Sequence, residues 1–402
     1  MIQRKIFETL KKELKKDKIT AITGARQVGK TTAMNFIFES IKDKAHFITF
    51  DNTAIKNLFE ENPDLFIEQH IKPYNTIFID EFQYAKQGGK ILKYIFDTTK
   101  KKLFISGSSA PEIAIQSLQY LVGRVSLIEM HPLSFEEFVQ YKSPEKKVLL
   151  EKPRKPNELE QLKSEFEEYL IFGGYPEVVK QQDFEEKKKI LQDIIQIYLL
   201  KEIKDVLGYK NSHEFEKLLR NIATNNGKLT KNTTLSSTLS VSWNKIQEYI
   251  SILEKTNIII PVRPFYSNKT KEITKTPKTY FQDIGFVNAL LNNFSRIENR
   301  VDKGEILESF VLHELTKKGL TPKFWNRQLS EIDFVLEKDE KIIGIECKSN
   351  DKKIPRPIKT FITEYNVSKA IIFSLKTDKE TKEKNTPIQF THYINTGSTK
   401  YF

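Results

Sequence analysis

At 402 residues, the chain is long enough for two or three domains, and its 28 Phe and 15 Tyr supply too much core-forming material for a disordered protein. Its net charge of +12 admits a nucleic-acid partner but is explained equally well by lysine-rich solubility. The single cysteine, Cys347, excludes an internal disulfide and suits a reducing cytoplasm.

The first 18 residues predict an amphipathic helix, because Ile2, Ile6, Leu10 and Leu14 recur on one helical face. This segment lacks the unbroken apolar core of a signal peptide. No apolar run in the chain approaches the roughly 20 residues that span a bilayer. We therefore expect a cytoplasmic protein with no membrane partner.

A short apolar run at residues 19–22 leads into the pattern G-x-x-x-x-G-K-T, and a helical run follows at residues 31–40. The two glycines let successive backbone N–H groups point at a phosphate, and the helix presents its positive end to it. Lys30 is expected to reach the β- and γ-phosphates, and the Thr31 hydroxyl to ligate Mg²⁺. The flanking strand and helix separate this pattern from a chance match. The predicted nucleotide-binding residues are Gly24, Ala25, Arg26, Gln27, Val28, Gly29, Lys30, Thr31 and Thr32.

The next strands are expected at residues 46–51 and 76–81, with a mostly helical stretch at 52–70 between them. The second strand, TIFIDE, is an apolar run that ends in two carboxylates. Ligands of parallel sheets sit beyond the carboxyl ends of the strands. We therefore predict that Asp80 holds Mg²⁺ through water and that Glu81 polarises the water that attacks the γ-phosphate. A solvated acidic turn is the alternative, which the preceding phosphate loop disfavours.

A further buried strand is predicted at residues 102–106, followed by a Gly-Ser-Ser turn. Ser108 in this turn is a candidate sensor of the γ-phosphate, although a plain turn explains it nearly as well. Arg124 precedes a fifth strand at residues 125–130, and a helix follows at 135–141. Arg124 suits an arginine finger or a phosphate sensor, and a structural salt bridge stays equally open.

In order, the segments GARQVGKTT, TIFIDEFQYA, LFISGSSA and LVGRVSLIEMHPLSFEEF resemble an AAA-type ATPase domain. Bacteria and archaea carry such chains, with a C-terminal half catalogued as domain of unknown function 4143. Residues 169–179 and 198–205 are similar to the opening of that domain. The resemblance spans essentially the whole chain and implies binding of ATP or ADP, and hydrolysis with Mg²⁺.

A winged helix-turn-helix is predicted after a linker at residues 145–163 and a further helical stretch. Its helices are expected at residues 213–224, 233–239 and 243–256, and its hairpin strands at 258–264 and 278–282, around a basic segment at 269–275. The third helix is the one that would enter a DNA groove. Such units also serve as protein–protein modules, and this helix has only Lys245 and Lys255 as cations, against Glu248 and Glu254.

The last third of the chain is expected to combine a helix with strands that carry acidic residues and a lysine. A helix is expected at residues 304–318, and strands at 323–325, 331–337 and 341–348. Glu346 and Lys348 share one face of the last strand, and Asp333 comes near them if the strands form a hairpin across residues 338–340. A helix with a Glu, then an Asp, then Glu-x-Lys resembles the core of the restriction-endonuclease-like nucleases. This resemblance implies that Asp333 and Glu346 hold a divalent cation, with Glu308 and Lys348 completing a nuclease site. The usual proline before the aspartate is Ile332, and a charged face on an exposed hairpin is the alternative.

The sequence thus predicts an α/β protein with four regions: an AAA-type P-loop ATPase domain with a parallel sheet (1–142), a linker (143–163), a helical and winged-helix domain (164–298) and a nuclease-like α/β domain (299–402). The favoured function is a Mg²⁺-dependent ATPase that couples its nucleotide state to the second half, acting on DNA. The alternative is a regulatory switch that holds a protein partner and has an inactive nuclease-like domain. A homo-oligomer is expected if Arg124 acts as a finger on a neighbouring subunit.

Overall fold

The computed structural model describes residues 1–107, 120–150, 155–202, 212–328, 330–348, 353–376 and 378–397. The chain divides into two compact units. The first comprises Met1–His131 and Ser251–Ile258, and the second Pro132–Ile250 and Ile259–Phe402. Within the described ranges, we find no helix with the length and apolar character needed to cross a membrane.

The first unit is built on a parallel sheet of five strands, in the order β2-β3-β4-β1-β5. Strands β1 and β3 are buried along their whole length, as continuous apolar runs in a parallel sheet predict. The strands predicted from the sequence are confirmed to within one or two residues at each end. They are β1 (Ile19–Thr23), β2 (Ala45–Thr49), β3 (Thr76–Asp80), β4 (Lys102–Gly107) and β5 (Val125–Glu129).

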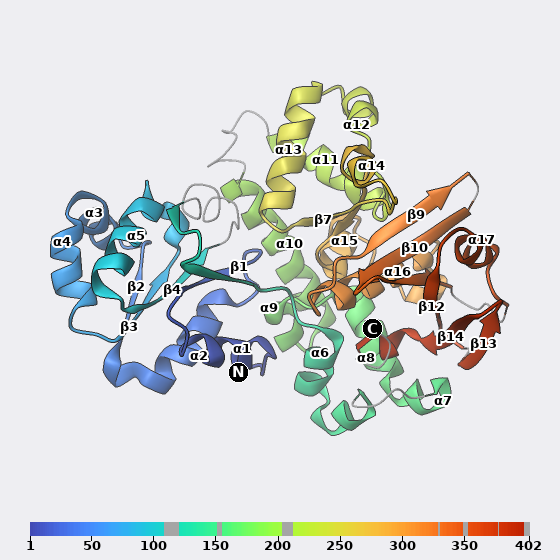
Figure 1. Cartoon of the computed structure of the whole chain (residues 1–402), viewed down its shortest axis with the longest axis horizontal. Helices are drawn as coiled ribbons and strands as arrows, with labels where there is room; N and C mark the ends of the chain where they lie inside the picture. Colours follow the sequence, from blue (N-terminus) through green and yellow to red (C-terminus); the bar gives the residue numbers. More distant parts are fainter. Residues whose placement is uncertain are drawn as a thin grey trace. The chain divides into compact units, whose positions relative to one another are not determined.

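Helices cover both faces of this sheet (Figure 1). On one face, Phe38 of α2 packs edge-on against Phe47 and Phe78 of the strands, and Phe7 of α1 stacks on Phe36. On the other face, an apolar cluster joins α3, α4 and α5 to the alternate strand residues. The helices are α1 (Ile6–Glu13), α2 (Lys30–Ile41), α3 (Thr53–Glu61), α4 (Pro63–Phe66) and α5 (Gly88–Thr99).

The second unit begins with helices, and some of them lie in the stretch that was predicted to be a linker. Residues 143–163 contain η6 (Pro144–Leu150), α7 (Pro156–Leu159) and η7 (Glu160–Leu162), and both Leu159 and Leu162 are buried. The part around Leu159 and Leu162 is therefore packed against the unit, whereas η6 has no buried residue. The other helices here are α6 (Phe135–Lys142), α8 (Lys163–Phe172), α9 (Pro176–Lys180), α10 (Phe184–Glu202) and α15 (Ile284–Leu290).

The middle of the chain has the predicted order of three helices and a hairpin, with one added short strand. The strands β6, β8 and β7 form a small antiparallel sheet, in which Ile259 pairs with Phe281. A short helix lies in the connection between β7 and β8. The elements are α11 (Ser212–Thr224), β6 (Lys228–Leu229), α12 (Asn232–Leu239), α13 (Trp243–Lys255), β7 (Ile259–Val262), α14 (Lys269–Thr274) and β8 (Lys278–Phe281).

The C-terminal part is a mixed sheet in the order β13-β14-β12-β11-β10-β9. The predicted hairpin is confirmed: Lys338 pairs with Lys341, and both turn residues between them have left-handed backbone. Beyond residue 375 the sheet gains two further strands, β13 and β14. The elements are α16 (Lys303–Thr316), β9 (Lys323–Arg327), β10 (Ser330–Lys338), β11 (Lys341–Cys347), α17 (Arg356–Glu364), β12 (Val367–Ser374), β13 (Lys379–Glu383) and β14 (Thr386–His392).

Candidate functional site

The predicted phosphate loop connects β1 to the first residue of α2. Gly24 and Gly29 have positive φ values of 144° and 98°, which only glycine adopts without strain. A Cβ at Gly24 would lie 2.1 Å from the Met130 carbonyl oxygen, so this position also excludes any side chain for lack of space. Lys30 opens α2, is buried, and donates from Nζ to the carbonyl oxygens of Gly24 (2.9 Å) and Ala25 (2.8 Å). The lysine thus closes the loop on itself.

Thr31 and Asp80 meet across the carboxyl edge of the sheet. The Thr31 hydroxyl donates to Asp80 Oδ2 at 2.7 Å, although the two residues lie 49 positions apart in the chain. Asp80 is 5% exposed, and its second oxygen accepts hydrogen bonds from the Ser106 hydroxyl and, at 3.1 Å, from the Glu81 N–H. A hydroxyl and a carboxylate held in this way are the oxygen ligands that Mg²⁺ prefers beside a phosphate.

Glu81 follows Asp80 at the end of β3, with a left-handed backbone (φ 54°). Non-glycine residues in this region are strained and cluster at functional sites. Its Oε2 accepts a hydrogen bond from the Gln83 side chain, which orients the carboxylate. Tyr84 lies close by: burial raises the pKa of its hydroxyl, and the neighbouring Arg26 of the loop opposes that rise. The loop and the end of β3 therefore form one polar site.

Two more residues at this site, besides Gln83 and Tyr84, were not predicted. Arg4, which precedes α1, donates to the carbonyl oxygens of Val28 (3.2 Å) and His131 (2.7 Å), so it ties the phosphate loop to the end of β5. Ser106 is fully buried at the end of β4, where it contacts Asp80. The place of Ser106 at the end of an apolar strand could have indicated that it lies at the site. Nothing near Arg4 in the sequence indicates its partners.

Three other residues of this unit that were predicted to act at the site are Ser108, Thr32 and Arg124. Ser108 lies outside the described residues. Thr32 is exposed on the first turn of α2. Arg124 donates from Nε to Asp97 Oδ1 of α5 at 2.7 Å, and both side chains are about a third exposed. The pairing fits the salt-bridge alternative and gives Arg124 a partner within its own unit.

We expect Arg124→Ala to leave ATP affinity and turnover within about twofold of the wild type, because an exposed ion pair has little energetic weight. Asp97→Ala removes the same pair and is the matched control. Steady-state turnover and a thermal melt of both variants test this. An arginine finger predicts a different result: turnover would fall at least about 10³-fold in Arg124→Ala only.

The C-terminal acidic residues lie at the edge where β10 and β11 pair. The register that matches Phe334 with Ile345 places Asp333 opposite Glu346. Asp333 Oδ2 accepts the Cys347 N–H at 2.7 Å, and Glu346 Oε1 pairs with Lys348 Nζ at 2.7 Å. Glu346 and Lys348, which were predicted to share one face of the strand, therefore form an ion pair.

Burial raises the pKa of two carboxyl groups at this edge. It raises the pKa of Asp333 well above its usual range, and the carboxylates of Glu346 and Glu308 raise it further. Burial also raises the pKa of Glu346 to about 7, against the influence of Lys348. In the parts of the chain that the structure describes, no three His, Cys, Asp or Glu side chains are grouped so that they could hold a metal ion.

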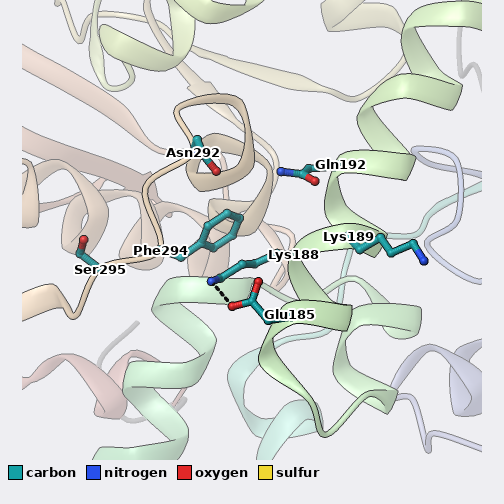
Figure 2. A pocket seen from close by; sticks show the side chains of 7 residues that line it. All are labelled: Glu185, Lys188, Lys189, Gln192, Asn292, Phe294 and Ser295. Carbon is teal, nitrogen blue, oxygen red and sulfur yellow. Dashed lines mark hydrogen bonds and ion pairs between the residues drawn. The ribbon is translucent and has the colours of Figure 1, made fainter.

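A separate polar pocket of about 560 Å³ lies between α10 and the segment after α15 (Figure 2). Lys188 in this pocket pairs with Glu185 at 2.6 Å and lies over the Phe294 ring. Lys189 points away from both in Figure 2. The positive charges of this pocket therefore do not converge on a common point.

Three parts of the chain match known domain families. Residues 16–139 match an AAA domain, residues 163–296 a domain of unknown function (DUF8612), and residues 303–393 a domain of unknown function (DUF4143). Residues 169–179 and 198–205, which we expected to open the DUF4143 domain, lie in the DUF8612 match instead. The chain thus contains an AAA-type P-loop NTPase domain, followed by these two domains.

Similar chains occur in archaea and bacteria. An uncharacterised protein of Methanocaldococcus jannaschii is 29% identical over 86% of this chain and 78% of its own length. One from Haemophilus influenzae is 25% identical over 82% of each chain.

Solved structures give weaker matches. The RuvB Holliday junction branch migration motor of Thermotoga maritima is 13% identical, over 64% of this chain and 89% of its own, with a TM-score of 0.33. The Aeropyrum pernix ORC2 protein is 12% identical, over 73% and 94%, with a TM-score of 0.35. At scores this low, neither structure carries information about what this chain does.

Proposed function

We propose that the chain is a Mg²⁺-dependent ATPase of the AAA type. The observation that carries this proposal is the 2.7 Å contact between the Thr31 hydroxyl and Asp80, next to the buried Lys30. The donor set fits a nucleotide with its metal: glycine-shaped backbone and an ammonium for the phosphates, a hydroxyl and a carboxylate for Mg²⁺. When bound, Mg²⁺ supplies positive charge that offsets the charge developing on the phosphates.

Glu81 is the residue that we assign to water activation. Its position next to Asp80, and the hydrogen bond from Gln83 that orients its carboxylate, support this assignment. A positioned carboxylate can accept a proton from the attacking water. Ser106, which holds Asp80, is a positioning residue in this assignment.

For the second half, we propose a protein-binding role rather than direct DNA reading. In the element α11-β6-α12-α13-β7-β8, which has the order of a winged helix, Lys245 of α13 pairs with Glu214 at 3.3 Å. In the β7–β8 connection, the position of a wing, Phe265 packs among the C-terminal core residues. Trp243 at the start of α13 is 46% exposed, which suits a protein surface better than a phosphate backbone.

The test is ATP turnover by the purified full chain, with Mg²⁺ and with excess chelator. We expect turnover that needs Mg²⁺ and that duplex DNA changes by less than about twofold, measured at about 50 and 200 mM salt because phosphate contacts are strongly salt-dependent. Stimulation by DNA that weakens steeply with salt would contradict the protein-binding role and favour action on DNA. Absence of Mg²⁺-dependent turnover would contradict the ATPase itself.

A further inference from the structure

Strand β8 inserts two side chains into the C-terminal domain. Lys278 and Tyr280 lie two residues apart, so they share one face of the strand, and they are only 4% and 0% exposed. Lys278 Nζ lies 3.2 Å from Glu308 Oε1 and 2.5 Å from Glu331 Oε1, and the Tyr280 hydroxyl donates to Glu308. One buried ammonium thus joins a carboxylate of α16 to a carboxylate of β10.

This ammonium also acts on the edge where β10 and β11 pair. Burial alone would lower the pKa of Lys278, but the carboxylates of Glu308, Glu331 and Asp333 together raise it above its ordinary value. In turn, Lys278 opposes the rise in the pKa of Asp333. We call Glu308, Glu331, Asp333 and Glu346 the carboxylate cluster. Lys278 pairs with Glu308 and Glu331 and acts on Asp333 through its charge.

Several oxygens of the carboxylate cluster already have protein partners, whereas the buried Glu346 Oε2 has no hydrogen-bond partner among the described residues. Asp333 Oδ2 already accepts a backbone N–H, and Glu346 Oε1 already pairs with Lys348. In the described part of the chain, no three carboxylates of the cluster converge as a metal-binding group, so a divalent cation would have to be held by fewer protein ligands. A divalent cation between Asp333 and Glu346 would also be repelled by the positive charges of Lys278 and Lys348.

We propose that Lys278 is the resident cation of the carboxylate cluster. Its ammonium takes the part that a divalent metal plays in restriction-endonuclease-like nucleases, and the cluster binds no divalent metal while β8 holds this position. The proposal concerns the second unit alone and does not depend on ATP hydrolysis in the first.

The connection before β8 keeps Lys278 in place. Phe265 is 3% exposed in an apolar cluster with Trp325 and Phe361, and Pro264 forms a β-bridge with Phe324. Withdrawal of β8 would expose these aromatic side chains to water, which is unfavourable. Lys278 is therefore a fixed part of the fold, held by packing as well as by charge.

The first test compares Mn²⁺ uptake by the full chain, without nucleotide, in the wild type and in Asp333→Asn. Calorimetric titration measures both, and any binding at the phosphate loop is common to the two proteins. We expect identical titrations. Loss of a saturable site in Asp333→Asn would show that Asp333 holds a metal in the wild type, and would overturn the proposal.

The second test replaces the ammonium. Lys278→Met keeps the unbranched side chain up to the position of Cε but leaves buried carboxylates without their cation, so we expect the melting temperature to fall by roughly 10 °C. We also expect it to gain saturable Mn²⁺ binding, and about 1 mM Mn²⁺ to restore part of the lost melting temperature. Lys269→Met is the matched control, because Lys269 pairs with Glu272 and Glu337 but is largely exposed.

The possible results distinguish the proposal from an ordinary ion pair. Lys278→Met that melts like Lys269→Met, or that is destabilised without any response to Mn²⁺, would overturn the proposal. In the second case Lys278 would be an ordinary ion-pair partner. If Lys278→Met does not fold, the comparison of the wild type with Asp333→Asn still decides, since it needs no change at Lys278.

Discussion

Replacing Glu81 with glutamine is expected to slow ATP turnover by about 10²-fold or more and to leave ATP affinity unchanged. The reason is that a positioned general base typically contributes a factor of about 10² to 10⁴, while the amide keeps the size of the side chain. The Gln83 contact to Oε2 can be kept by an amide oxygen, so the local geometry should survive. Turnover under saturating ATP, together with equilibrium binding of labelled ATP, measures the two effects separately.

Glu39→Gln is the control for this substitution, because Glu39 is an exposed carboxylate of α2 whose ion pair among the described residues, with Lys42, is long at 3.8 Å. It should change neither turnover nor affinity. Should Glu81→Gln hydrolyse ATP at the wild-type rate, the base would have to be another group. Should ATP affinity fall as well, Glu81 would be supporting the phosphate loop rather than activating water.

The elements of the first unit could be predicted because local signals there agree. Each strand is a continuous apolar run, and the two glycines with Lys30 fix the strand–loop–helix turn between β1 and α2. Asp80 could be placed at the site because parallel strands end at the same edge of the sheet. Arg4 could not be placed there, because it binds the backbone carbonyl oxygens of Val28 and His131, which lie far along the chain. Carbonyl groups are present at every residue and give no sequence signal.

In the second unit, some elements and contacts could not be predicted from residues that are close in the sequence. Strand β13 is the sequence KETKE, which has no apolar residue and was not expected to be a strand; it forms an edge by pairing with β14. The shared face of Glu346 and Lys348 followed from a period of two residues. The contact of Lys278 with Glu308 and Glu331 did not follow, because it joins residues 30 and 53 positions apart on three different elements.

Replacing Lys30 with alanine is expected to weaken ATP binding by at least about 10²-fold, which is the other large effect. Charge-assisted hydrogen bonds are worth about 1.5–3 kcal/mol each, and the ammonium is placed to make more than one of them to the phosphates. Isothermal titration with ATP and with ADP measures the loss. Lys42→Ala, at the exposed end of α2, is the control and should bind both nucleotides as the wild type does.

Lys30 also donates to the Gly24 and Ala25 carbonyl oxygens, so the same variant could weaken binding simply by loosening the loop. The two causes differ in what they do without nucleotide. A loosened loop lowers the melting temperature of the nucleotide-free protein, and it weakens ATP and ADP equally. Loss of a phosphate contact leaves that melting temperature almost unchanged but abolishes its increase on addition of ATP. We expect the second result, with a larger loss for ATP than for ADP, because the γ-phosphate adds charge within reach of the ammonium. An ATP affinity within about threefold of the wild type would mean that Lys30 does not contact the phosphates.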